Sequence, residues 1–241
     1  MTVDVQVRAN PQALAADVAD ALVERIDAAQ SASGTAHVVL TGGGIGTAVM
    51  AALASRDVDW SRVEFWWGDE RFLPAGDPER NATGAHEVLL DLVPVPSEHI
   101  HQMPADVGQG AEQAARDYAD ALAQASATGT VPRFDVLLLG VGPEGHVASI
   151  FPESPAAHAA GTVVAVHGSP KPPPTRLTMT FPAIRAAAEV WLVAAGAEKA
   201  EAIARALDPR TTPVDVPAAG ARGARRSMAW LDEAAASRLE A

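Results

Sequence analysis

Short apolar segments alternate with longer amphipathic segments along most of the chain. In the first long segment, Leu14, Val18, Leu22 and Ile26 recur near the 3.6-residue period of a helix. Val136–Leu139 is instead a continuous run of valine and leucine, as expected of a strand that is buried on both faces. This alternation is typical of parallel strands joined by helices that cover both faces of the sheet.

Together the patterns predict a series of strands and helices. The expected strands are Val3–Val7, His37–Thr41, Val63–Gly68, Phe134–Val141, Thr162–Val166, Arg176–Thr180, Val190–Ala195 and Met228–Leu231. The expected helices are Pro11–Ala29, Ile45–Ala54, Asn81–Leu90, Gly110–Ala125, Pro182–Ala188, Glu198–Leu207 and Asp232–Leu239. Gly168–Thr175 is rich in proline and is expected to be a rigid loop between two strands. We therefore predict an α/β fold with an open, mostly parallel, Rossmann-like sheet and helices on both faces, in a single domain over residues 1–241.

Composition and charge exclude several classes of protein. The chain of 241 residues has no cysteine, so it can form no disulfide, thiolate metal site or cysteine nucleophile. Its formal net charge of −12 disfavours nucleic acid and anionic membranes as partners, and the densest basic cluster (Arg222, Arg225 and Arg226) is expected to be a solvated loop. Asp4 and Arg8 interrupt any apolar core of a signal peptide. We expect a cytoplasmic protein.

One histidine occupies a position that suggests chemistry. His146 follows the strand expected at Phe134–Val141, within a turn that contains Gly140, Gly142 and Gly145. Open α/β sheets bind ligands at the carboxyl ends of their strands, and imidazole can act as a base near neutral pH. Most histidines are structural or exposed, but few structural roles require imidazole at such a turn. We expect His146 to be catalytic.

A second glycine-rich turn lies between an expected strand and an expected helix. Thr41, Gly42, Gly43 and Gly44 form this turn, where consecutive glycines would expose backbone N–H groups that favour an anion. The alternative is a plain tight turn. No Gly-Lys-Ser/Thr follows, so it is not a nucleotide-binding P-loop.

A charged triplet follows the strand expected at Val63–Gly68. Asp69, Glu70 and Arg71 would most often be a solvated turn. Alternatively, Asp69 or Glu70 could orient Arg71, whose guanidinium could clamp a phosphate or neutralise an oxyanion. Asn81 lies at an expected helix start, where an isolated asparagine would be the N-cap.

Lysine is rare in this chain. Of the 18 basic residues only Lys171 and Lys199 are lysines. A lysine in the proline-bounded loop suggests a local requirement for a compact ammonium group, although chance explains Lys171 equally well from composition alone.

Several segments, in order, resemble the 6-phosphogluconolactonases. They are Leu40–Gly44, Trp67–Pro74 with Asn81 beyond it, Phe134–Pro152, Ser169–Thr178 and Val216–Ala219. The resemblance implies hydrolysis of 6-phospho-D-glucono-1,5-lactone to 6-phosphogluconate in the oxidative pentose phosphate pathway. The small-molecule partner would be this phosphorylated sugar lactone. We expect a monomeric enzyme that uses no metal or cofactor.

The resemblance also implies roles for particular residues. The catalytic residues would be His146 as general base, Arg71 and Asp69. The substrate-binding residues would be Thr41, Gly42, Gly43, Gly44, Asn81, Gly142, Lys171 and Arg176, with Lys171 on the phosphate and Arg176 assisting. Asp69 could orient Arg71, orient His146 or bind a sugar hydroxyl, and either Arg71 or backbone N–H groups could hold the oxyanion. The family usually has serine and threonine where this chain has Gly44 and Ile45, which leaves backbone donors and Thr41 at this turn.

Two alternative functions remain open. Glucosamine-6-phosphate deaminases resemble the chain around Gly140–His146, but they typically continue with Phe-Asn-Glu-Pro, where this chain has Ser149–Ser154. A non-catalytic sugar-phosphate sensor would normally carry a basic DNA-binding helix-turn-helix, which this acidic chain does not suggest.

Other motifs are weaker. Gly140–Gly145 matches the dinucleotide-binding pattern, but Pro152 interrupts any long helix after it and Thr162–Val166 offers no carboxylate. There is no Gly-x-Ser-x-Gly of a serine esterase. His99 and His101 could be half of a metal site, but the segment that starts at His86 lacks the second histidine of a zinc-protease helix. We expect no metal.

Overall fold

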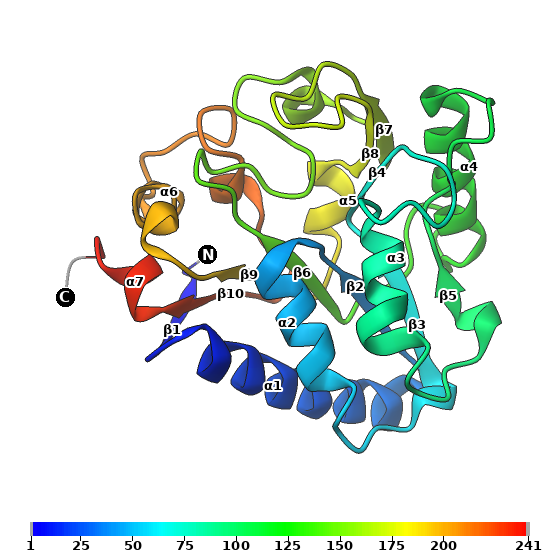
Figure 1. The fold of residues 1–241 in the computed structure, drawn as a ribbon, viewed down its shortest axis with the longest axis horizontal. Helices are drawn as coiled ribbons and strands as arrows, with labels where there is room; N and C mark the ends of the chain where they lie inside the picture. Colours follow the sequence, from blue (N-terminus) through cyan, green and yellow to red (C-terminus); the bar gives the residue numbers. More distant parts are fainter. Residues whose placement is uncertain (1, 240–241) are drawn as a thin grey trace.

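A seven-stranded parallel sheet forms the centre of the molecule in the computed structural model, which describes residues 2–239 (Figure 1). Its strand order is β1-β10-β9-β6-β2-β3-β5. The strands are β1 (Asp4–Arg8), β2 (Ala36–Leu40), β3 (Val63–Trp67), β5 (Ile100–His101), β6 (Val136–Gly140), β9 (Glu189–Ala194) and β10 (Arg226–Asp232). Because β1 pairs with β10, the first and last strands of the chain are neighbours.

Helices pack on both faces of this sheet. They are α1 (Pro11–Ser33), α2 (Gly43–Leu53), α3 (Asn81–Ala85), which continues into a π-helical turn (His86–Leu90), α4 (Ala111–Gln124), α5 (Phe181–Arg185), α6 (Ala200–Leu207) and α7 (Glu233–Ala236). Short 3₁₀ turns lie at Trp60–Arg62, Ser97–His99, Pro155–His158, Ala197–Lys199 and Pro217–Gly220. The α/β fold class with a parallel sheet is therefore confirmed.

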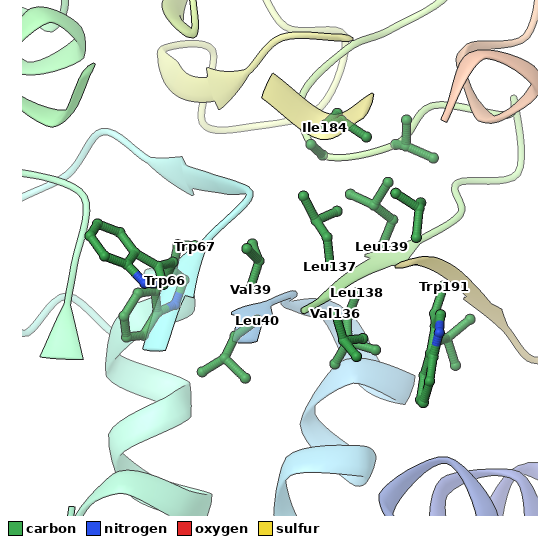
Figure 2. Packing of buried hydrophobic residues seen from close by; sticks show 14 of the residues in the cluster. Val39, Leu40, Trp66, Trp67, Val136, Leu137, Leu138, Leu139, Ile184 and Trp191 are labelled. Atoms are coloured by element: carbon green, nitrogen blue, oxygen red, sulfur yellow. The ribbon is translucent and has the colours of Figure 1, made fainter. Parts of the chain in front are cut away.

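The central strand β6 is buried on both faces, as its unbroken apolar run predicts. In Figure 2, Leu137 and Leu139 point toward Ile184 of α5, whereas Val136 and Leu138 point toward the opposite face, where α2 packs on β6. Successive side chains of a strand alternate between faces, so one short run of valine and leucine fills the core on both sides.

Not every strand joins the parallel sheet. β4 (Asp69–Arg71), β8 (Arg176–Met179) and β7 (Val163–Val166) form a separate three-stranded antiparallel sheet. The expected mostly parallel sheet is confirmed, but Thr162–Val166 and Arg176–Thr180, which were not expected to form a sheet of their own, lie outside it. The physical reason is the length of their connection: a parallel pair needs a crossover of about a dozen residues or more, whereas a short loop joins antiparallel neighbours.

None of the helices within residues 2–239 combines the length and apolar character that crossing a membrane requires.

Candidate active site

A cavity of about 380 Å³ lies at the carboxyl ends of the neighbouring strands β3, β2, β6 and β9. This is the position where open parallel sheets bind ligands. The residues predicted for the site all line this cavity: Thr41, Gly42, Gly43, Gly44, Asp69, Arg71, Asn81, Gly142, His146, Lys171 and Arg176. The structure thus brings together segments that are far apart in the sequence, while the roles of the individual residues stay predictions.

His146 is largely buried, with 17% of its side chain exposed, and its ring packs on Phe151 with ring centroids 4.6 Å apart. Burial lowers its pKa, and the nearby Glu144 carboxylate opposes this shift. The imidazole is therefore neutral at pH 7, as a general base must be. Its Nδ1 faces Glu144, so Nε2 is the ring nitrogen on the cavity side.

Gly142 makes room for this imidazole. A Cβ atom at position 142 would lie 2.0 Å from Nδ1 and 2.1 Å from Cε1 of His146, which no side chain can do. The turn is closed by the Gly142 N–H, which donates to the His146 carbonyl (3.0 Å), and by the Gly145 N–H, which donates to the Gly142 carbonyl (2.9 Å). Glycine is thus a steric requirement of the base's position.

Asp69 is a buried carboxylate at the wall of the cavity. Ser149 Oγ donates to its Oδ2 (2.6 Å), and Asn81 Nδ2 donates to its main-chain carbonyl (2.9 Å). The carboxylate does not bond to Arg71, whose guanidinium instead donates to the Glu79 carbonyl. Of the three roles considered for Asp69, the structure therefore gives no support to orienting Arg71.

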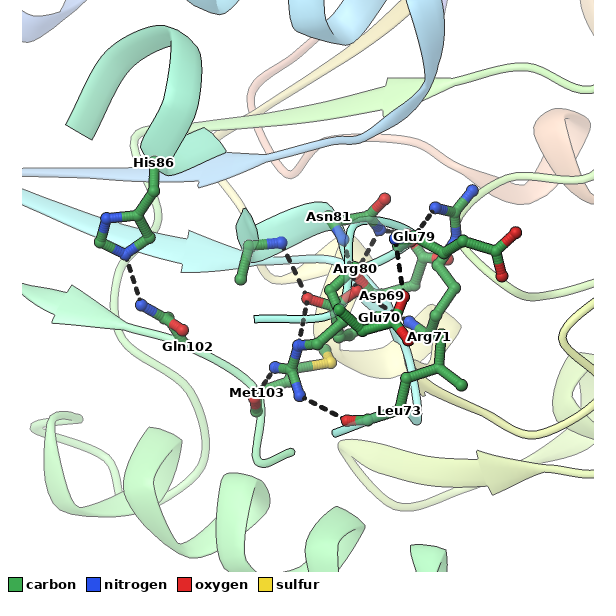
Figure 3. Close-up of polar contacts among 12 residues, drawn as sticks. Asp69, Glu70, Arg71, Leu73, Glu79, Arg80, Asn81, His86, Gln102 and Met103 are labelled. Atoms are coloured by element: carbon green, nitrogen blue, oxygen red, sulfur yellow. Dashed lines mark hydrogen bonds and ion pairs between the residues drawn. The ribbon is translucent and has the colours of Figure 1, made fainter. Parts of the chain in front are cut away.

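Glu70 is fully buried, so the alternative of a solvated turn does not hold for this residue (Figure 3). Its carboxylate accepts hydrogen bonds from the main-chain N–H groups of Arg71 (2.8 Å), Asn81 (2.7 Å) and Ala82 (2.9 Å), and it lies 3.6 Å from the Arg80 guanidinium. Burial raises the pKa of Glu70, and these donors oppose the shift.

Asn81 is not the N-cap of its helix, contrary to the sequence-based expectation. Arg80 occupies the N-cap position without a capping side-chain bond, and Glu70 provides the carboxylate that the N–H groups of the first turn require. The Asn81 side chain is consequently available to hold Asp69 and to line the cavity.

The glycine turn after β2 presents an uncapped helix N-terminus to the cavity. The helix α2 begins at Gly43, two residues before the expected start, and its N-cap Gly42 makes no side-chain capping bond. A Cβ atom at position 42 would lie 1.9 Å from Asn81 Oδ1, so glycine is required there, whereas a Cβ at Gly44 would meet nothing within 4 Å. Uncapped N–H groups at a helix start favour an anion, and binding of one here stays a prediction.

Four cationic side chains line the cavity: Arg71, Lys171, Arg176 and Lys199. Lys199 was not predicted for the site, although its rarity was a signal, since both lysines of the chain lie here. Asp69 and Glu198 are the carboxylates on the lining. A protein of net charge −12 thus concentrates positive charge in one concave site.

Arg176 supports the loop that carries Lys171. Its guanidinium donates to the main-chain carbonyls of Lys171 (3.2 Å), Pro172 (2.9 Å) and Pro173 (3.2 Å). Burial lowers the pKa of Arg176. The sequence predicted that Arg176 assists in binding phosphate. It did not reveal that Arg176 also stabilises the loop of Lys171.

The histidines considered as metal ligands have other partners. His101 Nε2 lies 2.5 Å and His99 Nε2 3.6 Å from the Glu64 carboxylate, and His86 contacts Asp91 and Gln102. Within residues 2–239 no three histidine, aspartate or glutamate side chains gather in an arrangement that could hold a metal ion.

The chain was compared with known proteins. The family model described as glucosamine-6-phosphate isomerases/6-phosphogluconolactonase matches residues 9–230. The chain belongs to this family. A protein named 6-phosphogluconolactonase from Streptomyces coelicolor is 52% identical, with 99% of this chain and 95% of the relative covered. The resemblance to the lactonases is thereby confirmed.

Solved structures agree with the observed fold. The 6-phosphogluconolactonase of Trypanosoma brucei superposes with a TM-score of 0.85 and 28% identity, with 99% of each chain covered. A monomeric glucosamine-6-phosphate deaminase superposes with a TM-score of 0.81, over 98% of this chain and 99% of its own, but at 19% identity this likeness concerns the fold alone.

Proposed function

We propose that this protein hydrolyses 6-phospho-D-glucono-1,5-lactone to 6-phosphogluconate, a step of the oxidative pentose phosphate pathway. The observation that carries the proposal is one cavity that contains a neutral imidazole, His146, together with the ammonium groups of Lys171 and Lys199. A lactone that carries a phosphate needs both: a base for water at one end and cations for the phosphate at the other.

The chemistry needs no covalent intermediate, because a lactone is an activated ester. Nε2 of His146 removes a proton from water as the water oxygen attacks C1 of the lactone. Negative charge then develops on the carbonyl oxygen, and the donors that face the cavity are the Arg71 guanidinium and the N–H groups of the glycine turns. When the tetrahedral intermediate collapses, the imidazolium returns its proton to the ring oxygen, which leaves as the hydroxyl of the product.

The phosphate aligns the substrate. Lys171, on the loop that Arg176 supports, and Lys199 would hold this group, and the α2 N-terminus offers further N–H donors. Binding energy gained at the phosphate is remote from C1 and serves to orient the lactone for attack. Asp69, fixed by Ser149, would accept a hydrogen bond from a sugar hydroxyl. The expectations of a monomeric, cytoplasmic enzyme that uses no cofactor stay predictions.

The test is a coupled assay with freshly prepared lactone and 6-phosphogluconate dehydrogenase, with spontaneous hydrolysis subtracted. We expect His146→Ala to lower kcat by about 100-fold or more, because proton transfer by a positioned base contributes about 10²–10⁴-fold. His167→Ala is the matched control, since His167 contacts Glu112 at the surface and does not line the cavity. Normal turnover by His146→Ala would remove the base from the mechanism, and ammonia release from glucosamine 6-phosphate would favour a deaminase.

A further inference from the structure

Glu144 lies between the proposed base and the proposed phosphate-binding lysine. Its Oε2 accepts a hydrogen bond from Lys171 Nζ (3.0 Å), and its Oε1 lies 3.0 Å from His146 Nδ1. Glu144 and His146 belong to the turn after β6, whereas Lys171 belongs to the loop between β7 and β8. One carboxylate therefore connects two segments that would act on opposite ends of the substrate.

The two contacts of Glu144 are not equivalent. The Lys171 ammonium makes a hydrogen bond of good geometry, whereas Nδ1 of His146 is buried and lies 3.0 Å from Oε1 without one. A buried donor that lacks a partner is unfavourable. A small rotation of the carboxylate would satisfy it, and the bond to Lys171 opposes that rotation.

We propose that Glu144 is a positioning residue that couples phosphate binding to activation of His146. This inference rests on the proposed function. A phosphate dianion at Lys171 replaces Glu144 as the counter-ion of the ammonium and repels the carboxylate toward His146. The released carboxylate then accepts the Nδ1–H bond, which fixes the tautomer whose Nε2 lone pair faces the attacking water and stabilises the imidazolium that forms.

The other charged group close to His146 does not move in this step. Three charged side chains act on the imidazole: Glu144, Lys171 and Asp69. Asp69 is already held by Ser149 and Asn81, and it acts on His146 whether or not phosphate is bound. Glu144 contacts both the imidazole and the ammonium of the proposed phosphate ligand Lys171, so the coupling is assigned to the Glu144–Lys171 pair.

The test supplies the lactone and the phosphate-like anion as two separate molecules. D-Glucono-1,5-lactone, which lacks the phosphate, is the substrate, and inorganic phosphite dianion is added as the probe. For the unsubstituted protein we expect phosphite to raise kcat/KM for this lactone about tenfold or more, a fraction of the contribution of a positioned base. For Glu144→Gln we expect this activation to disappear, and kcat for the phosphorylated lactone to fall about tenfold or more with a smaller change in KM.

Two further variants distinguish positioning from a loss of structure. Glu144→Asp keeps the charge and is expected to recover part of kcat and part of the phosphite activation. Glu112→Gln removes a carboxylate that contacts a histidine at the surface, Glu112 to His167, and is expected to behave like the unsubstituted protein. The thermal midpoints of all variants report whether each is folded.

The outcomes distinguish the two proposals. If the unsubstituted protein does not accelerate hydrolysis of the phosphorylated lactone, the proposed function fails. If it does, but Glu144→Gln changes only KM or retains the full phosphite activation, the coupling through Glu144 is overturned while the proposed function stands. A kcat loss in Glu144→Gln that Glu144→Asp partly restores, together with lost activation by phosphite, supports the coupling.

Discussion

At the scale of single residues, the position of the proposed base His146 depends on the absence of a side chain at Gly142. The His146 imidazole occupies the space that any side chain at position 142 would fill. We expect Gly142→Ala to displace the ring and to lower kcat by about 100-fold, close to the loss expected when the base itself is removed. Steady-state kinetics with the phosphorylated lactone measure this.

A matched glycine provides the control. A Cβ at Gly161 would meet nothing within 4 Å, and Gly161 does not line the cavity. Gly161→Ala should therefore leave kcat unchanged, and full activity of Gly142→Ala would contradict the steric argument.

The burial of His146 also predicts how activity changes with pH. Desolvation disfavours the charged imidazolium, so the pKa of His146 in the folded protein lies below its ordinary value of 6.5. Because the base acts in its neutral form, kcat/KM should rise as pH increases through this lowered pKa and be constant at pH 7 and above.

Measurements of kcat/KM over a range of pH test this rise. D-Glucono-1,5-lactone should be run in parallel, because it has no phosphate that titrates near pH 6. A half-maximal rate above pH 6.5 on that substrate would mean that His146 is not the titrating base or that its burial does not govern its pKa.

The sequence predicted which residues line the cavity better than it predicted their contacts. The glycines around His146 and the rare Lys171 marked the cavity, because both features have few structural uses. The burial of Glu70 was not predicted, because a charge after an apolar strand is usually solvated. Only the fold shows the main-chain N–H groups that donate to its carboxylate. Glu144 gave too little local signal, since its importance comes from its contact with Lys171 on a distant segment, whereas the rarity of Lys199 was a signal that was not used.

At the scale of elements, the start of α3 depends on the carboxylate of Glu70, which lies on β4. Glu70→Gln would leave the buried Arg80 guanidinium, 3.6 Å away, without its counter-charge. Removing one partner of a buried ion pair is strongly destabilising, so we expect the free energy of unfolding to fall by about 3 kcal/mol. Denaturant unfolding measures the change.

An exposed carboxylate is the matched control for that variant. Asp59 pairs with Arg62 at the surface, where such pairs contribute little, so Asp59→Asn should have a much smaller effect. If Glu70→Gln and Asp59→Asn lower the free energy of unfolding equally, the buried Glu70 carboxylate is not what stabilises the start of α3.

The elements themselves were largely predictable, whereas their assignment to sheets was not. Each expected strand has a counterpart within a few residues, because apolar runs and turn residues are local signals. Which strands pair is decided by distant contacts: β4 is only three residues long and charged, yet it pairs with β8, far along the chain. Periodicity alone does not contain that information.

At the scale of the whole molecule, an acidic protein surrounds a cationic cavity. Long-range attraction of a phosphorylated substrate to this cavity is screened by salt, over about 8 Å at about 0.15 M ionic strength. We expect KM for the phosphorylated lactone to rise as salt is increased from low to physiological concentration. The measurement is a set of saturation curves at several ionic strengths.

The lactone without a phosphate is the internal reference for this effect. Its KM should be nearly independent of salt, because it carries no charge for the cationic side chains to attract. If both lactones respond to salt equally, the cavity cations do not attract the phosphate.

The pairing of β1 with β10 has a consequence for biosynthesis. β1 leaves the ribosome first, but the strand it pairs with in the sheet, β10, ends only at Asp232. β1 must therefore wait, with both of its edges unpaired, until β10 has been synthesised, and addition of β1 to the sheet is a late event for the nascent chain.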